Sequence, residues 1–453
     1  LVEALAGNVR QARLMKNTPP LRGAFRLPFA GAHGPSAPAP SEQPPFQGLS
    51  CLSLHANWYD LSEKPLSMEG SFMKVFTIPT VNMVGRGSVK EIGSMAARFG
   101  SKTALVVAST GDVGLAQAKL VADVLKGSGI DAELFCKVTP NPLEETVMEG
   151  LALYGERGCG FLVAVGGGSA MDAAKGIGIL ATNGGRIEDY AGVDKVRTPI
   201  PPLVAVATTA GTGSEVTQFA VISDANHNKM TLNDRDMLPT ISVNDPEMML
   251  SMPPALTAAT GMDALTHAIE AYVSTGSSPL TDGRAWAATN LIAQNLPRAV
   301  QEGTNVEVRE RMCYGSFLAG IAFNNAGLGL VHAMAHPLGG HYNLPHGLCN
   351  ALLLPVVCRF NLTFDTVPRF AALARAFGVA HDWRPDRENA EACLRAIDDV
   401  KREAGLRESL RAHGVKREDF PLLADRALLE TVGATNPRPF DRADVIALYE
   451  EAF

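Results

Sequence analysis

Buried strands and helices alternate along the first half of the chain, and this rhythm constrains the fold more than any other feature. Apolar runs such as TALVVAST (103–110), FLVAVGGGS (161–169) and PPLVAVATT (201–209) are separated by segments with helical periodicity, for example GLAQAKLVADVLKGSG (114–129). Strands that alternate with helices of this length form a parallel sheet with helices on both faces. The sequence therefore predicts an α/β domain with a parallel sheet over residues 73–252.

The second half of the chain changes to helical periodicity. The change follows Pro253–Pro254, and helices are predicted from TAATGMDALTHAIEAYVS (257–274) to the final DRADVIALYEEAF (441–453). Proline suits the first turn of a helix because its missing N–H would have no partner there. We therefore expect an all-α domain over residues 253–453.

The composition is that of a globular, glycine-rich enzyme. Of the 453 residues 46% are hydrophobic and 43 are glycine, and this length exceeds what one ordinary core supports, so two domains are expected. The net charge of −7, without a basic stripe, argues against a nucleic-acid surface. Seven dispersed cysteines with no CxxC pair predict reduced thiols and a cytoplasmic location. No apolar run is long enough to span a membrane.

Residues 1–72 do not share the strand–helix rhythm. The stretch 17–47 is rich in Pro, Gly, Ala and Ser, and we expect disorder because it cannot bury enough apolar surface to offset its chain entropy. Five basic residues and a single acid lie within 1–40, a bias that weakly resembles an organellar transit peptide. The favoured alternative is an upstream read-through or an over-extended start, with Met68 or Met73 as the true first residue.

Two loops rich in glycine and small hydroxyl residues follow buried strands. The loop GGGS (166–169) leads into a helix, where backbone N–H groups and the helix dipole suit a pyrophosphate. The loop TTAGTGSE (208–215) ends the next strand and offers hydroxyl groups to a phosphate or ribose. The alternative to phosphate binding is a tight strand–helix turn for residues 166–169 and a solvated loop for residues 208–215. Two such loops in one sheet favour a dinucleotide.

Histidines and one aspartate carry the strongest chemical signal. Asp263 and His267 lie four residues apart in a predicted helix, so both side chains leave the same face. Four of the chain's ten histidines, His332, His336 and His346 among them, fall within GLVHAMAHPLGGHYNLPHG. An isolated Asp–His pair is more often a surface hydrogen bond, but chance does not explain this cluster. One carboxylate and three imidazoles suit Fe²⁺ or Zn²⁺, which would polarise a carbonyl oxygen beside a nicotinamide.

From about Phe76 to its C-terminus the chain resembles the iron-containing (group III) alcohol dehydrogenases. The segments that carry the resemblance are GGGSAMDAAKGIG, PPLVAVATTAGTGSE, GMDALTHAIEAY and GLGLVHAMAHPLGGHYNLPHG. The resemblance implies an N-terminal Rossmann-like domain and a C-terminal helical domain, the fold also found in dehydroquinate synthase, with the site in the cleft. It further implies interconversion of a primary alcohol and its aldehyde by hydride transfer, with Fe²⁺ (or Zn²⁺) and NAD (or NADP) as cofactors.

The resemblance also assigns roles to individual residues. The metal ligands that it implies are Asp263, His267, His332 and His346. His336, one turn after His332, matches a histidine near the substrate and is expected to relay a proton, with support of the metal ligands as the alternative. Phe323 is expected in the substrate pocket, with ordinary core packing as the alternative. The residues expected to bind the cofactor are Gly166, Gly167, Gly168, Ser169, Thr208, Thr209 and, with a solvated turn lysine as the alternative, Lys229.

One position departs from the family pattern. Many members end the first buried strand with an Asp that binds the adenosine ribose, whereas this chain has Ser109 there. A carboxylate would repel a 2′-phosphate and a serine would not. We therefore place Ser109 among the cofactor-binding residues and expect NAD, with NADP still open.

Three other functions remain open from the sequence. A hydroxyacid–oxoacid transhydrogenase of the same superfamily carries a transit peptide, which the N-terminal residues would match. A lyase similar to dehydroquinate synthase would need Lys and Arg near the metal, but segments 263–272 and 323–350 contain neither. A non-catalytic structural protein conflicts with the complete ligand set. We expect a homodimer or larger homo-oligomer that acts on a small alcohol or aldehyde and binds neither nucleic acid nor membrane.

Overall fold

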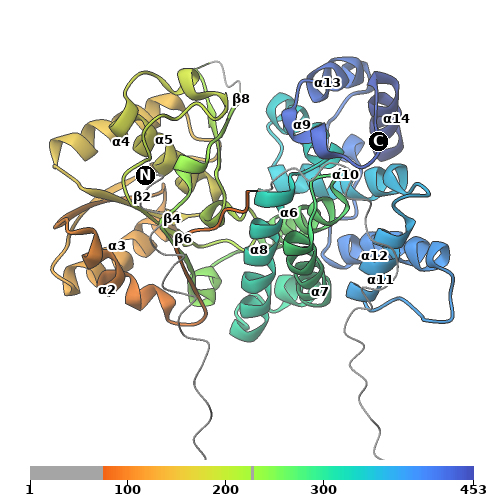
Figure 1. The fold of residues 1–453 in the computed structure, drawn as a ribbon, viewed down its shortest axis with the longest axis horizontal. Coiled ribbons are helices and arrows are strands. Elements are labelled where there is room, and N and C mark those ends of the chain that lie inside the picture. Colours follow the sequence, from red (N-terminus) through yellow and green to blue (C-terminus); the bar gives the residue numbers. More distant parts are fainter. Residues whose placement is uncertain (1–74, 226–228) are drawn as a thin grey trace, which may run out of the picture. The chain divides into compact units, whose positions relative to one another are not determined.

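The computed structural model describes residues 75–225 and 229–453. Residues 73–453 form one compact unit, with the strands in the first half of the chain and a bundle of helices in the second (Figure 1). The expectations about residues 1–72, namely disorder, a transit peptide or an over-extended start, concern residues outside these described ranges.

A six-stranded parallel sheet forms the centre of the first half. Its strand order is β1-β9-β6-β4-β2-β3, and every neighbouring pair is parallel. The strands are β1 (Val81–Val84), β2 (Thr103–Ser109), β3 (Asp131–Val138), β4 (Phe161–Gly166), β6 (Leu203–Ala207) and β9 (Ile241–Asn244). Both β4 and β6 are buried along their whole length, which explains their continuous apolar sequences. The predicted parallel α/β sheet is confirmed.

Helices cover both faces of this sheet. They are α2 (Ile92–Ala96), α3 (Asp112–Gly127), α4 (Glu144–Glu156) and α5 (Gly168–Asn183). Alternate residues of β2 enter two different cores: Leu105 and Val107 pack in the cluster that contains α4 and α5, whereas Val106 and Ala108 pack in the cluster that contains α3. The segment 88–100 is not one continuous helix, because 3-10 turns flank the five-residue α2.

A second sheet of three strands, in the order β5-β8-β7, does not follow from the sequence pattern. Its strands are β5 (Gly192–Val193), β7 (Phe219–Ser223) and β8 (Lys229–Asn233), and β7 pairs with β8 in antiparallel orientation. These strands are short and only partly buried, so they lack the apolar signature of the main sheet. The segment 75–85 contributes one strand, β1, to the main sheet.

The second half is helical throughout its described length, as predicted. Its helices are α6 (Pro254–Val273), α7 (Pro279–Gln301), α8 (Val306–Ala326), α9 (Leu330–Tyr342), α10 (His346–Asn361), α11 (Val367–Ala376), α12 (Asp386–Glu403), α13 (Phe420–Ala427) and α14 (Arg442–Ala452). Pro254 opens α6, as the proline pair predicts. Within the described ranges no single helix is long and apolar enough to cross a membrane; α8 and α9 pass that test only as a pair bent by 104°.

Helix α6 is the centre of the helical half. It is buried over most of its length and packs against α7, α8 and α10 (Figure 1). Helix α8 in turn packs against β9 and against the 3-10 turn at Ser214–Val216 in the α/β half. A helix that is buried on all sides has its side chains fixed by many neighbours, which suits it to hold chemically active groups.

Candidate metal centre and cofactor cleft

Two of the predicted metal ligands come from α6. Asp263 and His267 are separated by one helical turn, and both side chains are buried. His267 Nε2 lies 3.8 Å from Asp263 Oδ1. The i, i+4 spacing read from the sequence therefore does place a carboxylate and an imidazole side by side in the protein interior.

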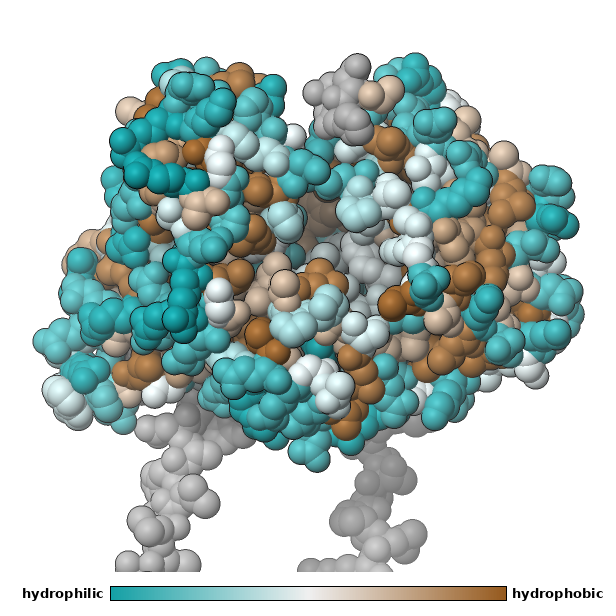
Figure 2. Space-filling model, turned by 180° about the vertical axis from the view of Figure 1, so that it is seen from behind, coloured by the Kyte–Doolittle hydropathy of each residue, from teal (hydrophilic) through white to brown (hydrophobic). Residues whose placement is uncertain are grey.

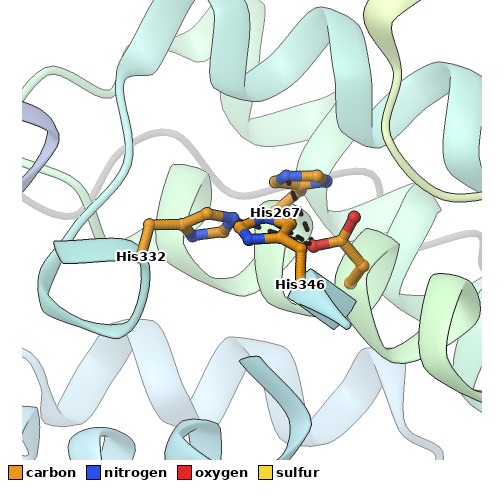
Figure 3. Close-up of side chains that lie close together, drawn as sticks. His267, His332 and His346 are labelled. Carbon is orange, nitrogen blue, oxygen red and sulfur yellow. Dashed lines mark ion pairs between the residues drawn. The ribbon is translucent and has the colours of Figure 1, made fainter. Parts of the chain in front are cut away.

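The other two predicted ligands come from α9 and α10. His332 lies in the first turn of α9, and His346 is the first residue of α10. Their Nε2 atoms lie 3.9 Å and 3.5 Å from Asp263 Oδ1, and the three imidazoles converge on this oxygen (Figure 3). One ligand atom from each of the four residues lies within 4.8 Å of the others, and the described ranges contain no second group of this kind.

The donor set fits a divalent cation. Burial lowers the pKa of His267, drives that of His332 well below the ordinary value and lowers that of His346 to about 3. The imidazoles are therefore neutral at physiological pH, and a neutral ring nitrogen has the lone pair that a metal ion needs. Three such nitrogens and one carboxylate oxygen at these separations suit a tetrahedral Fe²⁺ or Zn²⁺ site.

Two further buried residues contact the ligands, and the sequence analysis did not select either. Glu270 on α6 holds its Oε2 2.5 Å from His332 Nδ1. Asn350 on α10 donates from Nδ2 to Asp263 Oδ1 at 2.7 Å and also lies 3.0 Å from His332 Nε2. Their spacing in the sequence could have identified them. Glu270 is seven residues after Asp263 and Asn350 is four residues after His346, and both spacings place two residues on the same face of a helix.

A cavity of about 230 Å³ opens beside this cluster, between the α/β half and the helical half. The hollow between the two halves is visible in Figure 2. Asp263, His267 and His346 form part of its wall, and Gly168 and Ser169 from the glycine loop form another part. The candidate metal ligands and the candidate phosphate loop therefore face one common space.

The remaining predicted cofactor residues lie together at the carboxyl ends of neighbouring strands. The Thr208 N–H donates to the Gly166 carbonyl at 3.0 Å, and Ser109 ends the next strand, β2. A side chain at Gly167 would meet Thr209 Oγ1 at 3.1 Å, so this loop runs close to the neighbouring strand end. None of these five residues lines the cavity itself. This edge of a parallel sheet is where dinucleotides bind in related architectures.

Phe323, His336 and Lys229 all line the cavity. The Phe323 ring stacks on His267, with 4.2 Å between the ring centroids. The Nδ1 atom of His336 lies 2.9 Å from Glu430 Oε2, and its ring centroid lies 5.5 Å from that of His346. Burial lowers the pKa of Lys229. The geometry thus places all three beside the metal cluster, and their roles remain predictions.

Comparison with known proteins agrees with this arrangement. The family model for "Iron-containing alcohol dehydrogenase" matches residues 79–246, and that for "Fe-containing alcohol dehydrogenase family, C-terminal" matches residues 257–453. The NAD-dependent methanol dehydrogenase of Bacillus methanolicus is 43% identical over 381 residues, which cover 84% of this chain and 100% of the relative. Alcohol dehydrogenase 4 of Schizosaccharomyces pombe is 44% identical over 393 residues, covering 86% and 92% of the two chains.

A solved structure extends the agreement from sequence to fold. The crystal structure of a 1,3-propanediol oxidoreductase superposes with a TM-score of 0.82 at 42% identity, covering 84% of this chain and 100% of that one. The two family models together span most of the described residues, and both relatives are more than 40% identical to this chain. Both findings assign the chain to the same family. The chain belongs to the iron-containing alcohol dehydrogenases, a family of oxidoreductases.

Proposed function

We propose that this chain interconverts a small primary alcohol and its aldehyde, using NAD and one divalent iron ion held by Asp263, His267, His332 and His346. One observation carries the proposal: four ligand atoms from three helices lie within 4.8 Å of one another, and three of the four residues, Asp263, His267 and His346, line a cavity that also reaches the glycine loop. A bound divalent ion would polarise the alcohol or carbonyl oxygen as a Lewis acid.

The glycine loop is the proposed pyrophosphate site. Helix α5 begins at Gly168, so its first N–H groups and its dipole point toward the loop. Side chains at Gly167 and Gly168 would come within 3.1–3.2 Å of Thr209 and Thr212, so the lack of side chains keeps the approach to this helix end open. Lys229 lies across the same cavity and is proposed to bind the nicotinamide ribose.

His336 is the proposed proton relay. Its Nδ1 bonds to Glu430, whose side chain is 28% exposed, so the opposite ring nitrogen is left for the cavity. A proton that leaves the substrate hydroxyl can therefore pass through the imidazole toward a carboxylate that reaches water. Phe323 covers His267 and gives the cavity an apolar wall, which suits the carbon chain of a short alcohol.

Cofactor choice rests on Ser109 and on the relatives. The methanol dehydrogenase relative uses NAD, and we propose NAD for this chain as well. Ser109 carries no charge that would repel a 2′-phosphate, so NADP stays open as the alternative cofactor. Iron is proposed from the family, and Zn²⁺ suits the same ligands.

We further propose a homo-oligomer located in the cytoplasm. The six cysteines within the described ranges are free thiols, which supports a reducing compartment. Light scattering of the purified protein measures the assembly, and a monomer at micromolar concentration would contradict a homodimer or larger state.

Removal and return of the metal tests the proposed activity. Metal-free protein is expected to lose NADH-dependent reduction of butanal or acetaldehyde, and Fe²⁺ is expected to restore it. His332→Ala should remove both metal loading and activity, because one of four ligands is lost, whereas His336→Ala should retain the metal and mainly lower kcat and shift its pH profile. Full activity of the metal-free protein would refute the metal's role. Activity only with a hydroxyacid and an oxoacid as the paired substrates would favour the transhydrogenase alternative.

A further inference from the structure

Glu270 is a fully buried acid within the metal cluster that no step of the proposed reaction uses. It is 3% exposed and lies on α6, three residues after His267 and seven after Asp263. An acid at such a position normally has a partner that requires its charge, since an unpaired buried carboxylate is costly.

Both carboxylate oxygens of Glu270 contact the first turn of α9. Oε1 accepts a hydrogen bond from the Val331 N–H at 2.7 Å, and Oε2 lies 2.5 Å from His332 Nδ1. The first N–H groups of a helix have no partner within the helix, and a carboxylate there both satisfies them and favours the helix dipole. Glu270 therefore fixes the start of α9 to α6 and contacts the histidine that α9 contributes.

The contact with Oε2 decides which nitrogen of His332 faces the cluster. When Nδ1 donates its proton to the Glu270 carboxylate, Nε2 keeps its lone pair. This Nε2 is the atom that lies 3.9 Å from Asp263 Oδ1, on the side where the candidate ligands converge.

We propose that Glu270 is a positioning residue that holds His332 in the tautomer required for metal binding and fixes α9 to α6. The proposal rests on the metal site of the proposed function. Through Glu270, helix α6 controls three of the four ligands: it carries Asp263 and His267 itself and orients His332 on the neighbouring helix.

Glu270→Gln separates this role from simple packing, because the volume is nearly unchanged while one acceptor becomes a donor. If the amide oxygen accepts from the Val331 N–H, the NH₂ group faces His332 Nδ1 and moves the ring proton to Nε2, the ligand atom. If the amide is reversed, its NH₂ group meets the Val331 N–H and two donors face each other. Either arrangement weakens the metal site.

The experiment measures Zn²⁺ affinity by competition with a chromophoric chelator, together with the melting temperature of the metal-free protein. Glu270→Gln is expected to raise the Zn²⁺ dissociation constant about 10- to 100-fold, the usual effect of removing a group that orients a metal-bound histidine. Glu270→Asp keeps both acceptor oxygens but withdraws them by one methylene, so an intermediate affinity is expected. It also serves as the test variant if Glu270→Gln does not fold.

Ser274→Ala is the matched control, at the residue that directly follows α6. Ser274 is buried and its hydroxyl donates to the Ala326 carbonyl, away from the ligands, so its loss should lower the melting temperature and leave Zn²⁺ affinity unchanged. The proposal is overturned if Glu270→Gln binds Zn²⁺ as tightly as the parent protein. It is also overturned if Glu270→Gln and Ser274→Ala both lose Zn²⁺ affinity in proportion to their loss of stability. A parent protein that binds no Zn²⁺ would overturn the proposed metal site together with this inference.

Discussion

At Gly347, helix α10 packs tightly against α6, and both helices carry metal ligands. Gly347→Ala therefore tests how strongly the metal site depends on the packing of these two helices. Gly347 follows the ligand His346 at the start of α10. A methyl group there would lie 2.3 Å from the Ala259 carbonyl oxygen and 3.2 Å from the Cβ of Asp263, both on α6. The clash is with backbone, so a side-chain rotation cannot relieve it.

The size of the effect follows from these distances. Ordinary contact begins at 3.4 Å, so α10 must move about 1 Å away from α6 to accept the methyl group. Metal–ligand distances tolerate only about 0.2 Å, and His346 Nε2 now lies 3.5 Å from Asp263 Oδ1. We expect at least about a tenfold loss of metal affinity, equivalent to about 1.4 kcal/mol. Overpacking of the core should add about 1–3 kcal/mol of destabilisation.

The assay is a metal titration of the purified variant, with calorimetric melting of the metal-free form. Gly340→Ala is the control, because Gly340 lies in the neighbouring helix α9 and a methyl group there meets nothing within 4 Å. Alanine also favours helix over glycine, so this variant should match or exceed the parent in stability. The reasoning fails if Gly347→Ala binds metal and melts as Gly340→Ala does.

Three further predictions concern the cofactor side and the metal. Chelation should lower the melting temperature, since an ion at 100 times its dissociation constant contributes about 2.7 kcal/mol; identical melting with and without metal would contradict a bound ion. Lys175→Met removes the buried ammonium that donates to the carbonyls of Ser214, Thr217 and Phe219. The cavity wall should then be less rigid, and fluorescence titration should show a higher NADH dissociation constant. Ser109→Asp should raise the KM for NADPH relative to NADH, and an unchanged ratio would show that Ser109 does not approach the 2′ position.

Periodic patterns and short-range spacings could be read directly from the chain. The apolar runs of β4 and β6 predict a buried parallel sheet, because strands covered on both faces need apolar side chains at every position. The four-residue spacing of Asp263 and His267 predicts adjacent side chains, because helical geometry alone determines it. These inferences succeed because the backbone within one element is regular.

Only the tertiary structure decided which distant groups meet. Nothing local distinguishes Glu270 from an ordinary helical acid, and its role arises when α9 places His332 Nδ1 2.5 Å away. The pairing of His336 with Glu430, 94 residues later, and the antiparallel hairpin that brings Lys229 to the cavity have the same origin. Such contacts depend on how whole elements pack, and packing is determined by many weak interactions summed over the core rather than by any pattern along the chain.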